Sequence, residues 1–203
     1  RTPITIDDYM KSPYIVEPFR RLSYCLETDG ACAVVVTSAD RAKDLRQPPV
    51  YIMSVVQGGG PSAEWSGGPD TSLRLRGDHT QTHGAYIKDD LYGMAGVGPE
   101  DIDLAEIYDD FPIIPIITLE DLGFCKKGEG GPFVEGGRLE WPDGALPTNT
   151  SGGNIAECYM HGFELQIEAV RQMRGTSTSQ VRNAEICLVA SGPGVTPVTD
   201  MIV

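Results

Sequence analysis

The stretch Asn149-Thr-Ser-Gly-Gly-Asn-Ile-Ala-Glu-Cys-Tyr-Met-His-Gly162 leads into the strongest amphipathic helix pattern of the chain. Apolar and charged residues recur at helical spacing from Ala156 to Arg174, which predicts one continuous helix there. One face of this helix is expected to carry the apolar residues Met160, Phe163, Ile167 and Val170. The opposite face is expected to carry Glu164, Glu168 and Arg171. The pair Gly152-Gly153 allows the chain to turn tightly just before the helix.

Strands and helices alternate on both sides of this stretch. Before it, the sequence predicts a strand over Ile102–Tyr108 and then an apolar helix over Phe111–Leu122. Because that helix is apolar on nearly every side, we expect a partner or another part of the protein to cover it. After it, two strands are expected over Glu185–Ala190 and Val198–Val203, joined by a turn at residues 191–194 and paired antiparallel.

The first half of the chain contains fewer clear elements. Strands are expected over Ala31–Thr37, which suits a strand covered on both faces, and over Pro49–Val56, with a short helix to Leu45 between them. A helix over Ile87–Ala95 stops at Gly96. Two Gly- and Pro-rich loops occupy residues 58–78 and 125–148. The alternation of strands and helices predicts an α/β layered domain, which we assign to residues 49–203 and which follows a connecting segment over residues 1–48.

The composition excludes several classes of protein. The chain of 203 residues has a formal net charge of −13, which argues against binding to nucleic acid or to an anionic membrane. No apolar run is long enough for a membrane span, and the N-terminus lacks the apolar region of a secretory signal, so we expect a cytoplasmic protein. Five scattered cysteines and three histidines show no zinc-ligand spacing, which predicts reduced thiols and no metal site.

Three motifs, in the same order along the chain, resemble those of the thiolase superfamily. Residues 149–162 are similar to the thiolase motif of an asparagine, a Gly-Gly pair and a catalytic histidine at a helix start. The segment Glu106-Ile-Tyr-Asp-Asp-Phe111 is similar to Asn-Glu-Ala-Phe, and Ala190-Ser-Gly-Pro-Gly194 is similar to the Cys-x-Gly-Gly-Gly turn. The resemblance implies a thiolase-like layered fold with a mixed sheet and packed helices. It also implies that this chain is the C-terminal half of a thiolase subunit, and that residues 1–48 include the end of the N-terminal half.

The chain departs from ordinary thiolases at the residues that perform their chemistry. By this resemblance Tyr159 replaces the histidine base, Tyr108 replaces an asparagine of the oxyanion site, and Ala190 replaces the second catalytic cysteine. A phenol with a pKa of about 10 is a poor substitute for imidazole as a base. The tyrosine-containing segments instead resemble those of the thiolase-like lipid-transfer proteins of sterol side-chain breakdown, which are retro-aldolases that cleave a tertiary β-hydroxyacyl-CoA. The resemblance implies a carbon–carbon lyase in which one tyrosine removes the hydroxyl proton and another donor supports the thioester enolate.

The resemblance also implies which residues form the site. The residues expected to be catalytic are Tyr108, Tyr159 and His161. The residues expected to contact the substrate are Asn149, Gly152, Gly153, Ser191 and Gly192. If the tyrosines act as a pair, their side chains must converge on one cleft. No cofactor is expected beyond the coenzyme A that forms part of the substrate.

The expected partners are an acyl-CoA substrate and the N-terminal thiolase half, supplied by the full-length protein or by a second chain. The resemblance further implies a small OB-fold and zinc-ribbon protein that helps to complete the acyl-CoA site, within a homo- or hetero-oligomer. Two other functions stay open. The chain could belong to a non-catalytic thiolase-fold subunit that binds acyl-CoA or a partner. It could also belong to an acetyl-CoA acyltransferase, if the match of Tyr159 to the histidine is wrong.

Overall fold

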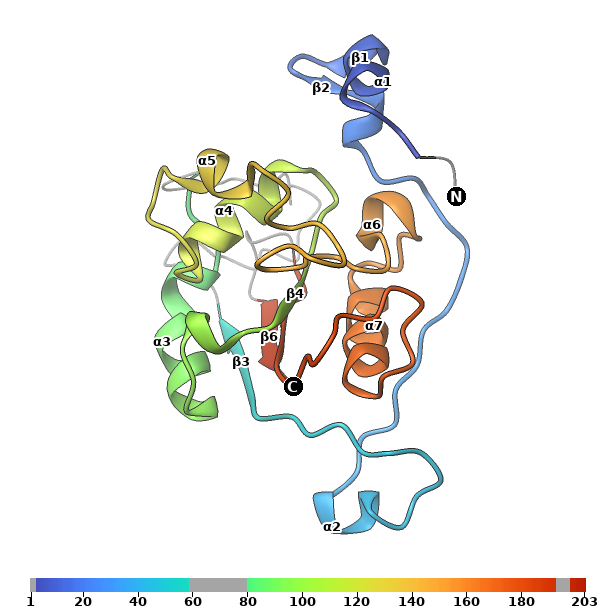
Figure 1. Ribbon diagram of the computed structural model, residues 1–203, viewed down its shortest axis with the longest axis vertical. Coiled ribbons are helices and arrows are strands. Elements are labelled where there is room, and N and C mark those ends of the chain that lie inside the picture. The colour runs from blue at the N-terminus through green and yellow to red at the C-terminus, as the bar shows by residue number, and fades with distance from the viewer. Residues whose placement is uncertain (1–2, 59–79, 193–197) are drawn as a thin grey trace, which may run out of the picture.

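A four-stranded mixed sheet forms the centre of the computed structural model, which describes residues 3–58, 80–192 and 198–203 (Figure 1). The strands, in their order across the sheet, are β3 (Ser54–Gly58), β6 (Val198–Ile202), β5 (Cys187–Ala190) and β4 (Leu104–Ile107). The pair β4 and β5 is parallel, whereas β6 runs antiparallel to both of its neighbours. The predicted mixed sheet and the antiparallel pairing of the last two strands are therefore confirmed.

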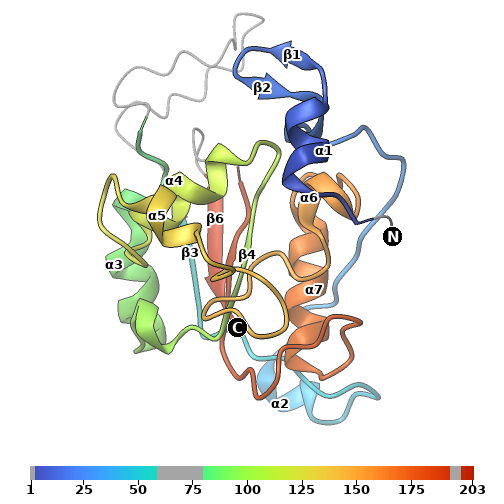
Figure 2. The same cartoon turned by 45° about the horizontal axis from the view of Figure 1, so that its top comes forward.

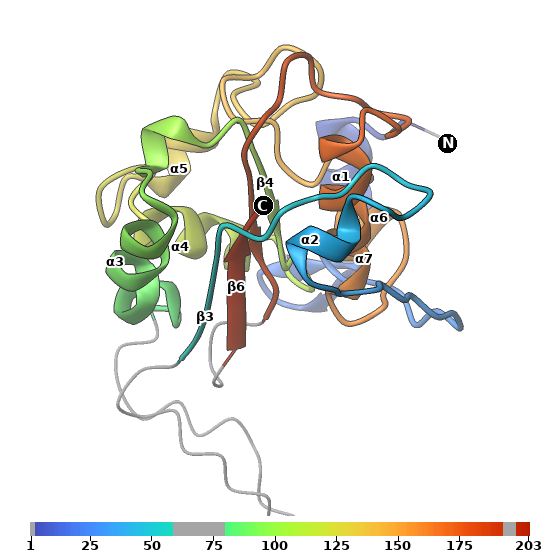
Figure 3. The same ribbon diagram turned by 90° about the horizontal axis from the view of Figure 1, so that it is seen from below.

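Helices cover both faces of this sheet, as Figure 3 shows when the sheet is seen nearly edge-on. One face carries α3 (Gly84–Ala95) and α4 (Ile113–Asp121), together with the short α5 (Gly130–Val134). The other face carries α7 (Phe163–Met173), which contacts β4 and β5. The packing of α7 against these two strands confirms the predicted α/β layered architecture.

Strand β4 alternates between two apolar clusters. Its residues Ala105 and Ile107 belong to the cluster under α3 and α4, whereas Leu104 and the following Tyr108 pack with Leu165 of α7. Because both faces of the strand are covered, its residues are all buried, as is typical of parallel strands inside an α/β domain.

The predicted continuous helix over Ala156–Arg174 is wrong at its beginning. The structure has a short helix α6 (Gly153–Ala156), a break, and then α7 from Phe163 onward. The break occurs because His161 (φ 57°) and Gly162 (φ 84°) adopt the left-handed backbone conformation, which no right-handed helix can continue.

The predicted orientation of this helix is also wrong. The buried residues of α7 are Glu164, Leu165, Glu168, Ala169 and Gln172. The apolar residues of the expected inner face, such as Phe163 and Ile167, are only half-buried. Polar side chains face inward because the loop beside the helix supplies hydrogen-bonding partners for them, which a hydrophobicity pattern does not register.

The N-terminal region contains α1 (Ile6–Lys11), the hairpin of β1 (Tyr14–Val16) and β2 (Phe19–Arg20), and the 3-10 turn η1 (Arg21–Ser23). This region lies at the end of the molecule near α6 (Figure 2). From there an extended connection passes along the outside of α7 to α2 (Ala39–Ala42). Thr28 accepts a hydrogen bond from the Tyr159 amide at 3.4 Å, and the Pro48 carbonyl accepts one from Arg174 Nε at 2.8 Å.

The predicted strand over Ala31–Thr37 is wrong, because these residues belong to no strand and Val35 is 88% exposed. Their β-branched side chains favour an extended backbone, but a strand also requires a neighbouring strand. This segment instead lies beside a helix.

The remaining elements match the predictions with shifted ends. The short helix before Leu45 is α2, and α3 ends at the left-handed Gly96 (φ 73°) as expected. The strand predicted over Pro49–Val56 corresponds to β3, which begins later, at Ser54, and continues to Gly58. The predicted loop over residues 125–148 contains α5. The predicted loop over residues 58–78 lies, beyond Gly58, outside the described residues.

The apolar helix predicted over Phe111–Leu122 is α4, which contacts α3 and α5. Ile113, at the start of this helix, is 41% exposed. That a partner covers the helix stays a prediction. The 3-10 turn η2 (Pro99–Asp101) precedes β4. Within the residues described, none of the helices combines the length and the apolar character needed to cross a membrane.

Candidate active site

The hydroxyl groups of Tyr108 and Tyr159 lie 2.9 Å apart. Tyr108 directly follows β4, and its amide donates to the Ala190 carbonyl at 2.8 Å, which extends the parallel ladder by one residue. Its side chain is 1% exposed, whereas that of Tyr159, between α6 and α7, is half-buried. The two rings meet edge to face, with centroids 6.4 Å apart. The fold thus brings the two predicted catalytic tyrosines into direct contact.

His161 completes an aromatic group with these tyrosines. Its ring centroid lies 5.9 Å from that of Tyr108 and 5.7 Å from that of Tyr159. The residue is exposed and its backbone is left-handed, so the side chain borders the pair at the surface.

Gly162 is a site residue that the sequence analysis missed. A Cβ atom at this position would lie 2.8 Å from Cδ2 of Tyr108 and 3.1 Å from the Ser191 carbonyl oxygen. The combination of a positive φ and this close contact requires glycine. The signal in the sequence was the glycine that ends the Tyr-Met-His-Gly segment.

The predicted substrate-binding residue Asn149 is engaged with the protein backbone. Its Oδ1 accepts from the Ile107 amide at 2.7 Å, and its Nδ2 donates to the Ile107 carbonyl at 2.8 Å. The side chain therefore acts as a strand neighbour along the free edge of β4, and contact with substrate stays a prediction.

The second glycine of the pair lies against a buried carboxylate. Gly152 has a φ of 122° and Gly153 a φ of 61°. A Cβ atom on Gly153 would lie 2.5 Å and 2.6 Å from the two carboxylate oxygens of Asp109. Asp109 also accepts from the Asn154 amide at 2.7 Å, which connects the end of β4 to α6. Asp109 was not among the site residues predicted from the sequence.

Ser191 follows β5, and its carbonyl oxygen, like the ring of Tyr108, would lie close to a Cβ atom on Gly162. Its hydroxyl donates to the Thr199 carbonyl, and its amide donates to Asp200 Oδ1 at 3.3 Å. The second oxygen of Asp200 lies 2.7 Å from Nε2 of the buried His83. The predicted residue Gly192 is buried next to Ser191. The predicted site residues thus gather where the parallel strands β4 and β5 end, which is where ligands usually bind in α/β sheets.

Comparison with known families shows to which family the chain belongs. Residues 71–203, more than half of the chain, match the family model for a thiolase C-terminal domain-like region. The chain belongs to the thiolase family.

Two relatives and one solved structure are similar to this chain over nearly its whole length. A 17-hydroxy-3-oxo-4-pregnene-20-carboxyl-CoA lyase of Mycobacterium tuberculosis is 43% identical over 95% of this chain and 49% of the relative. A steroid side-chain-cleaving aldolase of Thermomonospora curvata is 39% identical over 95% of this chain and 48% of the relative. The structure of an Ltp2–ChsH2(DUF35) aldolase aligns with a TM-score of 0.90 and 38% identity over 98% of this chain and 51% of that chain. The chain therefore spans about half the length of these relatives and corresponds to the C-terminal part of a thiolase-like subunit.

The electrostatics of this candidate site favour a neutral phenol at Tyr108. Burial raises the pKa of Tyr108 well above the ordinary value of 10.0, and the hydrogen bond with Tyr159 and the charge of Asp110 raise it further. Burial also raises the pKa of Asp109 to about 6, although hydrogen bonds from Asn154 and Asn149 oppose that shift. Since burial disfavours charge, Tyr108 is a phenol in the resting site and not a phenolate.

Proposed function

We propose that this chain is part of a carbon–carbon lyase that cleaves a β-hydroxyacyl-CoA of the sterol side-chain type by a retro-aldol reaction. The observation that carries the proposal is the 2.9 Å contact between the hydroxyls of Tyr108 and Tyr159. The similarity to a steroid side-chain-cleaving aldolase and to a carboxyl-CoA lyase supports it.

The reaction needs one group that removes a proton and one that supplies a proton. Removal of the proton from the β-hydroxyl lets the Cα–Cβ bond break, so that Cβ becomes a ketone. The electron pair moves to Cα and into the thioester carbonyl as an enolate, which a hydrogen-bond donor stabilises. Protonation of the enolate then releases a shortened acyl-CoA. The step consumes no nucleophile, no oxidant and no free coenzyme A.

The hydrogen-bonded phenols can serve both needs without a resting phenolate. One phenol accepts the hydroxyl proton while it passes its own proton to the other phenol, and the second phenol donates to the enolate. This relay preserves the number of protons on the pair, which suits a site where burial raises the pKa of Tyr108. His161 borders the pair, and we propose that it contacts the same substrate.

Acyl transfer of the ordinary thiolase kind fits this chain less well. Ala190, which by resemblance stands where thiolases have their second catalytic cysteine, offers no thiol and is fully buried. The base position holds the phenol of Tyr159. A thiolase acyl transfer requires a thiolate and a base near neutral pKa, and these two positions provide neither.

We further propose that the active enzyme includes the preceding thiolase half and a second polypeptide. The chain spans about half of its relatives, and the solved relative carries two names, Ltp2 and ChsH2(DUF35). A small OB-fold and zinc-ribbon protein is the partner that the family resemblance implies. Activity of the purified full-length protein, measured with and without such a partner, tests this part.

The reaction itself is tested with the full-length protein and a tertiary β-hydroxyacyl-CoA, with products measured by mass spectrometry. We expect a ketone and a shortened acyl-CoA in equal amounts, without added coenzyme A. Cleavage of a β-ketoacyl-CoA that depends on free coenzyme A would show an acyltransferase instead. Binding of the acyl-CoA without turnover, in the presence of the partner, would show a non-catalytic subunit.

A further inference from the structure

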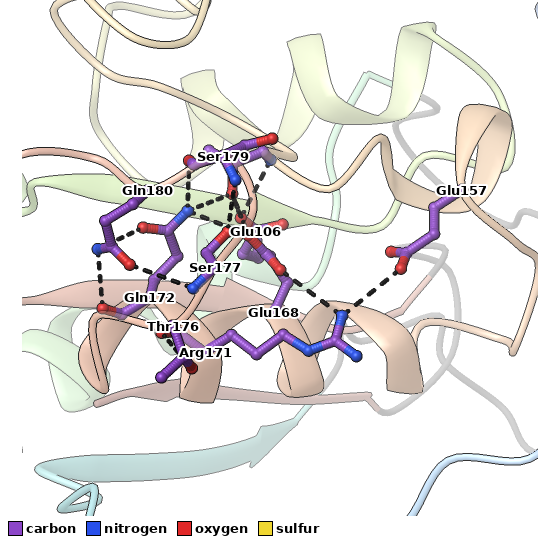
Figure 4. Close-up of polar contacts among 10 residues, drawn as sticks. Glu106, Glu157, Glu168, Arg171, Gln172, Thr176, Ser177, Ser179 and Gln180 are labelled. Carbon is purple, nitrogen blue, oxygen red and sulfur yellow. Dashed lines mark hydrogen bonds and ion pairs between the residues drawn. The ribbon is translucent and has the colours of Figure 1, made fainter. Parts of the chain in front are cut away.

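Glu106 is a buried acid that the proposed reaction does not use. It lies on β4 two residues before Tyr108 and is 0% exposed. The titratable groups that interact with it are Glu168 from α7, Asp109 from the end of β4, and Cys187 from β5. The nearby guanidinium of Arg171 lies 4.0 Å from Glu168 and 3.8 Å from Glu157, as Figure 4 shows.

The hydroxyl of Thr150 connects Glu106 to Glu168. Its Oγ1 lies 2.8 Å from Oε1 of Glu106 and 2.8 Å from Oε1 of Glu168. Nε2 of Gln172 donates to the same hydroxyl oxygen, also at 2.8 Å. The Thr150 amide donates to Glu106 Oε1 at 3.2 Å. One hydroxyl thus sits between two carboxyl groups.

These contacts require one more proton than the hydroxyl carries. A hydroxyl donates one proton and accepts through two lone pairs. If both glutamates were ionised, one of the two short oxygen–oxygen contacts would join acceptors only, inside a buried site. If one glutamate is protonated, it donates to Thr150, Gln172 donates to Thr150, and Thr150 donates to the other glutamate. Each of these three contacts of the Thr150 hydroxyl then joins a donor to an acceptor.

The surroundings decide which glutamate is protonated. Oε1 of Glu168 accepts from Ser177 Oγ at 2.5 Å and from Gln172 Nε2 at 3.0 Å, and its other oxygen faces Arg171. These donors stabilise a negative charge. Oε2 of Glu106, by contrast, has no hydrogen-bond partner among the residues that the structure describes. Burial also raises the pKa of Glu106 to about 8, although its bonds from Thr150 oppose the shift.

We propose that Glu106 is a neutral carboxylic acid whose proton holds the turn at Thr150 in place beside the tyrosine pair. The same turn contains Asn149, which pairs with Ile107, and Gly153, which fits against Asp109. Glu106 is thereby a positioning residue. The proposed protonation of Glu106 does not depend on the proposed function, whereas its positioning role rests on the proposed function.

Two matched variants of the full-length protein test the protonation state. In Glu106→Gln, an amide N–H replaces the acid proton toward Thr150. We expect its Tm to equal that of the wild type near about pH 5 and to exceed it by several degrees near about pH 8.5. At the higher pH the free energy of unfolding of the wild type is lowered by the burial of Glu106, and that of the glutamine variant is not. In Glu168→Gln, an amide N–H would face several donors, so we expect a lower Tm at both pH values. An infrared band of a protonated carboxylic acid should be present in the wild type at neutral pH and absent from Glu106→Gln.

Three results would overturn the assignment. They are a Glu106→Gln variant that loses stability as Glu168→Gln does, two variants that are equally tolerated, and the absence of an infrared difference.

The positioning role has its own readout. Lyase turnover of the wild type should fall above about pH 8, and that of Glu106→Gln should not fall in this range. Glu106→Ala should lose most of the turnover at all pH values, and the glutamine variant should restore it. Identical pH profiles for the wild type and Glu106→Gln would remove the positioning role and leave the protonation state intact. No lyase activity in any variant, with the expected Tm differences, would defeat only the proposed function.

Discussion

The hydroxyl oxygens of Tyr108 and Tyr159 lie 2.9 Å apart, although 51 positions separate the two residues in the sequence. Strand β4 places the first tyrosine, and the break between α6 and α7 places the second. Each phenol is the hydrogen-bonding partner of the other in a largely buried site. Removal of either hydroxyl therefore leaves the other without the partner on which the proposed relay depends.

Gly162 controls how closely the two tyrosine-bearing segments approach. We expect Gly162→Ala in the full-length protein to displace the Tyr108 ring, because its Cβ would lie 2.8 Å from Cδ2 of that ring. Turnover should fall at least about tenfold, since small displacements of reacting groups are costly. Gly175→Ala is the matched control, because Gly175 also has a positive φ (67°) but no atom within 4 Å of its Cβ position. Both variants should lose about 1–2 kcal/mol of stability from backbone strain. Equal turnover of the two would contradict the proposed role of Gly162.

Replacement of Asn149 should mainly lower the stability of the folded protein. Asn149→Ala removes two hydrogen bonds to the backbone of Ile107, which should lower the free energy of unfolding by about 1–3 kcal/mol. Asn183→Ala is the control, because Asn183 has a similar φ (56°) but is exposed. Denaturant unfolding measures the difference between the two variants. A variant at Asn149 with normal stability and a raised KM would instead show a direct contact with substrate.

The pH dependence of stability should show two separate windows. Asp109 and Glu106 both have a folded-state pKa above their ordinary values, at about 6 instead of 3.8 and at about 8 instead of 4.5. The folded state therefore holds these protons more tightly than the unfolded state, and stability falls as pH rises through each window. Relative to Asp109→Asn, the wild type should lose stability up to about pH 6 and then stay level. Relative to Glu106→Gln, the loss should continue to about pH 8.

Denaturant unfolding of the wild type and both variants across this pH range provides the measurement. Difference curves that are flat between about pH 4 and pH 8, or that slope the other way, would show that these acids are ionised in the folded protein.

Much of the fold could be predicted from local patterns. The strands β4, β5 and β6 are short apolar runs between turn residues, and their order follows from common α/β topology. The extended segment at Ala31–Thr37 could not be judged in this way, because its β-branched residues report backbone preference and not the presence of a neighbouring strand. The inward face of α7 was also hidden, since the partners of the buried Glu168 include Thr150 before α6 and Ser177 after α7, which the periodicity within the helix does not show.

Only the site residues that match the motifs of the family could be predicted from the sequence. The motif match predicts that Tyr108, Tyr159 and His161 belong to one site, and the structure places their side chains next to one another. The roles of Asp109 and Gly162 depend on distances of a few ångströms between separate segments, which spacing along the chain does not encode. The proton on Glu106 follows only from the number of donors and acceptors around Thr150.

The central claim is that the two phenols carry protons for the reaction. Replacement of one tyrosine by phenylalanine keeps the ring and its packing and removes only the hydroxyl. Tyr92→Phe is the matched control, because Tyr92 is also buried and its hydroxyl donates to the Leu122 carbonyl at 2.9 Å, away from the site. This control should lose about 1 kcal/mol of stability and no turnover.

The decisive measurement is therefore kcat for retro-aldol cleavage by Tyr108→Phe, Tyr159→Phe and Tyr92→Phe in the full-length protein, with acyl-CoA affinity measured in parallel. The proposed relay predicts that kcat falls about a hundred- to ten-thousand-fold in the first two variants, that acyl-CoA binding persists, and that Tyr92→Phe turns over normally. Near-normal turnover by both Tyr108→Phe and Tyr159→Phe would contradict it.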